Sequence, residues 1–235
     1  MTAKLAPLRE PVPRAHVADA IFERLAGLIV TGDLAPGSPL PPERDLAERF
    51  QVSRIIVRSA THRLAELGLV RVRQGGATLV CDPAESSHPD VALLAMRWSP
   101  SRKALLIDLF ERQLLGAHPL LVLAEPRVRA SHVEALGAVV DRHESGALPL
   151  RDFEEEFWIM VADIGENSVY RRETRFWFQA VREQPGTHHP EFGTRAQRVA
   201  MYREIVRRLE HKQDAANAYL LAIHAVLSML AKRER

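Results

Sequence analysis

Residues 32–80, GDLAPGSPLPPERDLAERFQVSRIIVRSATHRLAELGLVRVRQGGATLV, decide the fold of the first third of this chain. After a proline-rich loop, the spacing of apolar residues predicts a short helix at 42–50, a tight turn and a second helix at 53–67. Gly68 ends this helix. Two short alternating segments around a glycine-containing turn within 69–81 then predict a β-hairpin.

A helix is also expected before this stretch, because apolar residues from Val17 to Ile29 recur at helical spacing. Helix, short helix, turn, helix and hairpin is the element order of a winged helix-turn-helix. In that fold the last helix enters the major groove of DNA and its first turn reaches the base edges. Arg54 and Arg58 are four residues apart and therefore share one helical face. The opposite face, which includes Val57, is apolar and must pack on the other helices.

The charge pattern agrees with a DNA-binding role for this segment. The whole chain carries a net charge of only +2, but the stretch from Glu43 to Gly75 holds seven arginines and four acidic residues. Ser53 is a predicted helix N-cap, where its hydroxyl and the free backbone N–H groups can hold a phosphate. Without the motif, a solvated charged surface would explain the arginines equally well.

The quoted stretch resembles the DNA-binding domain of the GntR family of regulators. It follows the frame G-x-L-x-P-G-x-x-L-P-x-E-R-x-L-A, then V-S-R-x-x-V-R, then L-x-x-x-G-L-V. The resemblance implies that arginines of the helix-turn-helix contact DNA and that the hairpin wing enters the minor groove. Together with the helix argument, it predicts these DNA contacts: Arg44, Ser53, Arg54, Ile55, Arg58, Arg73, Gln74 and Gly75.

Three departures from the family pattern bear on the operator sequence and not on DNA binding itself. Pro42 stands where a small residue such as serine often caps the helix, and Ser59 replaces a usual glutamate. Ile55 and Ile56 replace a usual Thr-Pro or Thr-Thr pair. The sequence leaves open whether Ile55 touches a thymine methyl group or lies in the core.

Beyond residue 89 the pattern is helical to the end of the chain, so the predicted fold class is mainly α. We expect a winged helix-turn-helix followed by an all-α helical bundle. This bundle, with the motifs LIDLFERQLLGAHPLLVLA and FEEEFWIMVADIGENSVY, resembles the effector domain of the FadR-type branch. The predicted domains are an arm at 1–14, the winged helix at 15–81, a linker at 82–89 and a ligand-sensing, dimerising domain at 90–235.

Many members of that branch hold a divalent metal through one aspartate and three histidines. The matching positions in this chain are Glu154, Trp158, Tyr202 and His224. Tryptophan cannot bind a metal and neutral tyrosine rarely does, so too few donors remain for a closed site. We therefore predict no metal and no cofactor, and we expect His224 to be a buried, hydrogen-bonded histidine.

The resemblance then implies a small-molecule effector that binds without a metal. Trp158, Tyr202, Phe157 and Phe176 could pack against an acyl chain, and Arg112 could pair with an acidic head group. This set predicts an acyl-CoA or another fatty-acid-type ligand. The alternatives are a metal-dependent sensor of organic acids, or a bundle that the aromatic residues fill completely, with Arg112 in a structural ion pair. The predicted effector-binding residues are Arg112, Glu154, Trp158, Tyr202 and His224.

The sequence carries no catalytic triad, phosphate loop or dinucleotide motif, so we do not expect an enzyme. An enzyme that uses a cavity of the helical domain would be the alternative from a different class. The chain has one cysteine, no apolar run at its start and no apolar stretch long enough to span a bilayer. We therefore expect a cytoplasmic protein with no membrane partner. The family resemblance implies a homodimer that regulates transcription by binding double-stranded operator DNA.

Overall fold

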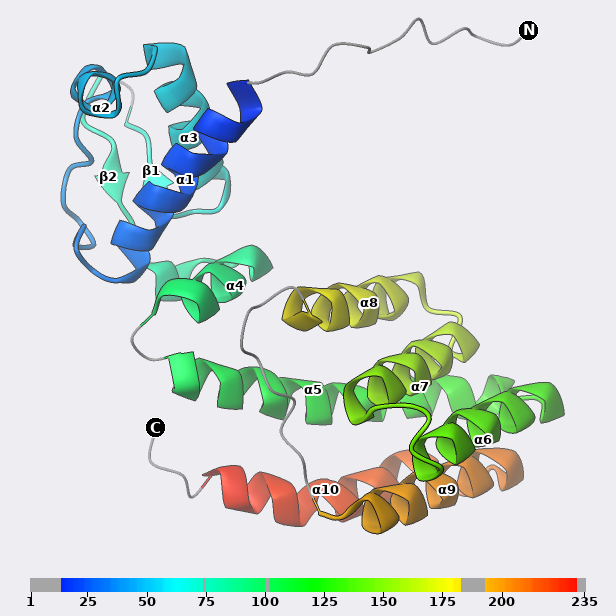
Figure 1. Cartoon of the computed structure of the whole chain (residues 1–235). Helices are drawn as coiled ribbons and strands as arrows, with labels where there is room; N and C mark the ends of the chain where they lie inside the picture. Colours follow the sequence, from blue (N-terminus) through cyan, green and yellow to red (C-terminus); the bar gives the residue numbers. More distant parts are fainter. Residues whose placement is uncertain (1–13, 74, 100–101, 183–192, 232–235) are drawn as a thin grey trace, which may run out of the picture. The chain divides into compact units, whose positions relative to one another are not determined.

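The computed structural model describes residues 14–73, 75–99, 102–182 and 193–231, and helices dominate its architecture (Figure 1). This confirms the predicted mainly α fold class. The chain divides into two compact units, with the boundary between Arg102 and Lys103. The predicted arm at 1–14 lies outside the described residues, apart from Arg14, which begins the first helix.

The first unit contains a three-helix core with a small wing. Its elements in chain order are α1 (Arg14–Val30), α2 (Glu43–Phe50), α3 (Arg54–Glu66), β1 (Val70–Arg71), β2 (Leu79–Val80), η1 (Pro83–Glu85) and α4 (Pro89–Trp98). Both α1 and α2 pack on α3. Leu25, Ile29, Val57 and Leu64 are almost completely buried in the shared core, which is the apolar face that the helical spacing predicted.

The wing is a short antiparallel hairpin in which Val70 pairs with Val80. The proline-rich loop closes its other edge, because Val80 donates its N–H to the carbonyl of Ser38 and Leu40 donates to the carbonyl of Thr78. The strands are shorter than the alternation in 69–81 predicted. Gly68 has a φ of +70°, a left-handed conformation that lets the chain leave α3 and enter β1 directly.

The α4 helix belongs to the first unit, which corrects the predicted domain boundary. We expected a linker at 82–89 and the second domain from residue 90. Instead α4 packs on α1, and Val91 and Leu94 join the core of the first unit. The ring of Trp98 lies against Gly27 so closely that an added Cβ would meet it at 3.4 Å. The apolar face of α4 therefore fixes the boundary near residue 102.

The second unit is a bundle of helices. Its elements are α5 (Arg102–Ala124), η2 (Glu125–Arg127), α6 (Ala130–Glu144), α7 (Leu150–Ile164), α8 (Ser168–Arg182), α9 (Arg195–His211) and α10 (Ala215–Ala231). Neighbouring helices pack as α6 on α7, α7 on α8 and α9 on α10, while α6 also packs on α9 (Figure 1). The helical pattern predicted beyond residue 89 is thus confirmed for the described residues of the second unit. None of the described helices is both long and apolar enough to cross a membrane.

Candidate nucleic-acid interface and effector pocket

The turn between α2 and α3 presents the N-terminus of α3 to solvent. Gln51 adopts a left-handed conformation with a φ of 55°, which ends α2. Val52 donates its N–H to the carbonyl of Ala47 and closes the turn. Ser53 then caps α3 with an extended backbone, but its hydroxyl makes no capping hydrogen bond. This exposed hydroxyl and the first N–H groups of the helix are therefore available to an anion such as a phosphate.

The two faces of α3 divide as the sequence predicted. Val57 and Ala60 are fully buried, whereas Arg54 and Arg58 are exposed. Ile55 is 79% exposed, so its alternative assignment to the core is wrong. An isoleucine at this exposed position of the first turn has the shape to contact a thymine methyl group.

Arg58 is held by Glu43, a pairing that the sequence analysis missed. The Nε and Nη2 atoms of Arg58 donate to the carboxylate of Glu43, with the shortest contact at 2.9 Å. These hydrogen bonds, and the charge of Glu43, raise the pKa of the Arg58 guanidinium above its ordinary value. The side chain of Arg58 nevertheless stays 74% exposed. Glu43 thus orients this arginine without covering it.

The other predicted DNA contacts also lie at the surface. Arg44 is exposed and pairs with its neighbour Asp45, with Nε and Oδ1 3.1 Å apart. Arg54 has no hydrogen-bonding or ionic partner among the described residues. On the wing, Arg73 is exposed and Gly75 has a left-handed φ of +72°. Gln74 lies outside the described residues.

In the second unit, three of the predicted effector residues form a hydrogen-bonded chain, in which Trp158 and Tyr202 are buried and Glu154 is half-buried. The indole Nε1 of Trp158 donates to the hydroxyl of Tyr202 at 3.2 Å, and this hydroxyl donates to Oε1 of Glu154 at 3.3 Å. Only 2% of Tyr202 is exposed. Its pKa is raised well above 10.0, first by burial and then by the charge of Glu154. The chain links α7 to α9.

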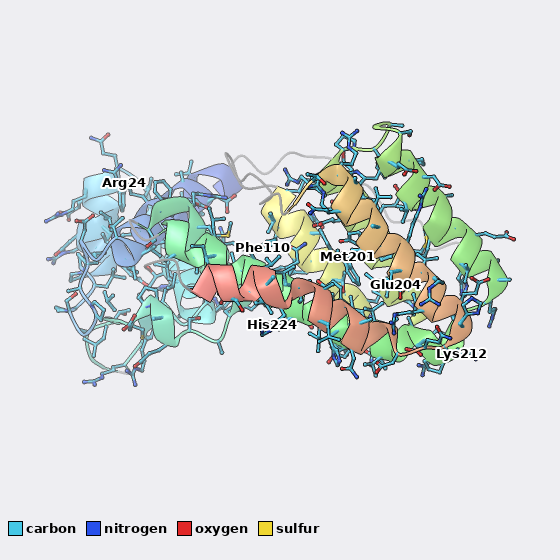
Figure 2. The ribbon with its side chains drawn as sticks, turned by 90° about the horizontal axis from the view of Figure 1, so that it is seen from below. Arg24, Phe110, Met201, Glu204, Lys212 and His224 are labelled. Carbon is cyan, nitrogen blue, oxygen red and sulfur yellow. The ribbon has the colours of Figure 1, made fainter. Side chains whose placement is uncertain are left out.

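His224 does not belong to this group, which corrects the sequence prediction. It is exposed on α10 and not buried (Figure 2). The α10 residue that contacts Trp158 is instead Tyr219. The two rings meet edge-on, with their centroids 5.2 Å apart. The phase of the helix explains the difference, because Ile223 takes the buried position and turns its neighbour outward. No three His, Cys, Asp or Glu side chains of the described residues converge as metal ligands do.

A cavity of about 80 Å³ lies between α5, α7 and α8 and contains two of the predicted effector residues, Arg112 and Trp158. Aromatic residues form much of its wall: Trp158, Tyr170, Trp177 and Phe178. The guanidinium of Arg112 lies 4.5 Å from the centre of the Trp177 ring and pairs with Glu173. Phe157, in contrast, is fully buried against Tyr202 and does not line the cavity.

Glu173, the partner of Arg112, and Trp177 were not among the predicted effector residues. The strongly amphipathic sequence of α8 carried the signal, since Tyr170, Thr174, Trp177 and Val181 recur at helical spacing and all line the cavity. The ion pair that we considered as the structural alternative for Arg112 is therefore present. It sits at the wall of a cavity and not in a filled core.

Comparison with known proteins gives one family match and several related regulators. The profile described as bacterial regulatory proteins of the gntR family matches residues 17–80. An uncharacterized HTH-type transcriptional regulator of Mycobacterium tuberculosis is 39% identical over 135 residues, which are 56% of this chain and 54% of that protein. The HTH-type transcriptional regulator LutR of Bacillus subtilis is 30% identical over 152 residues, 61% of this chain and 66% of LutR.

The matched region thus spans about half the length of the mycobacterial relative. Among solved structures, this chain is similar to Lar, which is described as controlling the expression of the Listeria monocytogenes agr system and mediating virulence. The TM-score is 0.52 at 18% sequence identity, over 92% of this chain and 97% of that one. This likeness concerns the fold alone.

Proposed function

We propose that this chain, whose residues 17–80 are a DNA-binding domain of the GntR family of bacterial regulatory proteins, is a transcription regulator that binds operator DNA. The observation that carries the proposal is the exposed surface of the helix-turn-helix. It presents Arg44 on α2, and Arg54 and Arg58 on α3, whose N-terminus has no side-chain capping hydrogen bond. Arginines on the face of α3 that the core does not use can reach base edges, and the helix N-terminus can hold a phosphate.

The regulator acts as a homodimer on a two-fold operator in this proposal. A single helix-turn-helix contacts few bases, and a two-fold protein binds two half-sites about one helical turn of DNA apart. The dimer, the FadR-type branch and a cytoplasmic location all remain parts of the proposal. The helical second unit and the family match of the first unit support them.

Selection of duplexes from a random pool tests the proposal directly. We expect the wild-type protein to enrich a short palindrome and to bind it at least about a thousandfold more tightly than a duplex of unrelated sequence at physiological salt. The affinity for both duplexes should fall steeply as salt rises, because bound phosphates release counterions. Enrichment of no sequence would contradict the proposal.

We further propose that the cavity between α5, α7 and α8 binds the effector. Arg112 supplies a cation, and Trp158 and Trp177 supply apolar walls. The ion pair between Arg112 and Glu173 is partly exposed, at 36% and 44% of the two side chains. Exposed ion pairs contribute about 0–1 kcal/mol, so an anionic ligand can displace Glu173 at little cost.

The size of the cavity favours a small organic acid over a long acyl group. Its volume is about 80 Å³, whereas pockets for drug-sized ligands usually span roughly 300–1,000 Å³. A long acyl chain would have to open the bundle, at the cost of core contacts. The acyl-CoA hypothesis is therefore the weaker of the two, and the effector in this proposal is a carboxylate with a short apolar or aromatic body.

Tryptophan fluorescence can test the effector site with benzoate, butanoate and palmitoyl-CoA as probes. We expect a small carboxylate to change the emission, because two of the three tryptophans line the cavity. Glu173→Gln should bind the carboxylate more tightly, since the competing anion is gone, and Arg112→Ala should not bind it. If only palmitoyl-CoA changes the emission and releases the selected duplex, the small-acid assignment is wrong.

A further inference from the structure

The contact between Glu43 and Arg58 has a geometry that matters for base recognition. Glu43 begins α2, and its carboxylate meets the guanidinium of Arg58 on α3 from the side. Nε lies 3.1 and 3.3 Å from the two carboxylate oxygens, and Nη2 lies 2.9 Å from one of them. This contact occupies Nε and one hydrogen of Nη2. It leaves Nη1 and the second hydrogen of Nη2 unused.

The unused edge of the guanidinium is the edge that can recognise guanine. An arginine specifies guanine by donating two parallel hydrogen bonds to O6 and N7 in the major groove. Two adjacent N–H groups at the end of the guanidinium provide such a pair. An arginine without a partner must give up its rotamer freedom when it binds, whereas the side chain of Arg58 is already oriented by Glu43.

We propose that Glu43 is a positioning residue that fixes Arg58 for bidentate recognition of one guanine in each operator half-site. Glu43 would then help to set base specificity although its carboxylate is held by Arg58 and not by DNA. The inference rests on the proposed operator binding. The inference gives Arg58 and Arg54 different roles. Arg54 has no partner among the described residues, so its side chain can contact either a phosphate or a base.

The charge of Glu43 gives this role a signature that a purely structural role lacks. A carboxylate beside the DNA interface repels phosphates, so it weakens binding to every duplex regardless of sequence. Its removal should therefore lower base discrimination and leave binding to unrelated DNA unchanged or tighter. A variant that only damages the fold of α2 would weaken binding to both kinds of duplex together.

The experiment compares Glu43→Gln with Glu48→Gln in the full-length protein. Glu48 lies on the same helix, is exposed and has no ionic partner among the described residues, so its variant removes the same charge without touching Arg58. The probes are the duplex that the wild-type protein selects from a random pool, the same duplex with each guanine replaced in turn, and an unrelated duplex of equal length. Arg58→Ala identifies the guanine that Arg58 recognises.

We expect the preference for that guanine over its replacements to be at least about fivefold lower in Glu43→Gln than in the wild-type protein. The affinity of Glu43→Gln for the unrelated duplex should stay the same or rise. Glu48→Gln should keep the full preference. In an Arg58→Ala background, Glu43→Gln should change the base preference no further, because the two residues act as one unit.

Three results would overturn the inference. Glu43→Gln could keep the full preference, it could lose preference only at a position that Arg58→Ala does not affect, or it could weaken binding to all duplexes equally. Any of these leaves the proposed function intact, because the wild-type protein still selects an operator. Failure of the wild-type protein to select any sequence would instead contradict the proposed function, and this inference with it.

Discussion

Removal of one hydroxyl group, by the substitution Tyr202→Phe, should destabilise the helical bundle measurably. The Tyr202 hydroxyl accepts the indole N–H of Trp158 at 3.2 Å and donates to Glu154 at 3.3 Å. Trp158 is only 4% exposed, so its N–H cannot turn to water when the hydroxyl is gone. A buried donor that loses its partner costs about 1–3 kcal/mol.

Other contributions to this substitution should be small. Phenylalanine keeps the edge-on contacts of the ring with Phe153 and Phe157, both with centroids 4.7 Å apart, so no large cavity forms. Glu154 is only half-buried and can be hydrated. The free energy of unfolding should therefore fall by about 1–3 kcal/mol, mainly through Trp158.

Urea unfolding followed by tryptophan fluorescence measures this change. Tyr170→Phe is the matched control, since that hydroxyl has no partner among the described residues and its loss should change stability by less than about 0.5 kcal/mol. Trp158→Phe and the double variant complete a cycle whose coupling energy isolates the hydrogen bond. A stability of Tyr202→Phe equal to that of the wild-type protein, or strict additivity in the cycle, would show that this hydrogen bond does not stabilise the bundle.

Three further predictions concern the two units. Burial raises the pKa of both Tyr202 and Tyr219 well above 10.0 in the folded protein, so above pH 10 the folded state binds more protons than the unfolded state. The urea midpoint of unfolding should therefore not depend on these two groups below pH 10, and it should fall as the pH rises above 10. The fall should be less steep in a Tyr202→Phe/Tyr219→Phe variant. An equally steep fall in the wild-type protein and the variant would contradict this prediction. Leu64→Ala should cost about 2–5 kcal/mol of stability in denaturant titrations, because Leu64 is fully buried in the core of the first unit. A loss below about 1 kcal/mol would contradict this prediction. Since Trp158 and Tyr202 bind each other, a chelator should leave the unfolding midpoint unchanged, and elemental analysis should find clearly less than one metal per chain.

Helical periodicity was sufficient to predict most of this fold. The 3.6-residue repeat places Val57 and Leu64 on one face of α3 and Arg54 and Arg58 on the other, and the structure has this division. The same repeat predicts α4 but not the core that α4 joins, because the apolar pair Val91 and Leu94 is compatible with either neighbour. Tertiary packing on α1 decides that question.

The details of the candidate sites were less accessible from the sequence. Glu43 and Arg58 are 15 residues apart, and only the geometry of the turn between α2 and α3 brings a long side chain onto that carboxylate. Alignment with the family pattern placed His224 in the effector site. The rotation of α10 instead brings Tyr219 inward. An alignment error of one residue rotates the assigned side chain by about 100° around the helix axis. Weak similarity between helices does not fix the alignment to within one residue, so it could not decide which residue of α10 faces inward.

The affinity of arginine variants for the selected duplex tests whether α3 recognises DNA. Arg54→Ala and Arg58→Ala each remove an exposed arginine from α3, and Arg24→Ala removes one from the exposed face of α1 (Figure 2). At a fixed moderate salt concentration, we expect each α3 variant to lose about 1–3 kcal/mol of operator binding and Arg24→Ala to bind as the wild-type protein does. Wild-type operator affinity in both α3 variants, or an equal loss in all three, would contradict the claim that α3 recognises DNA.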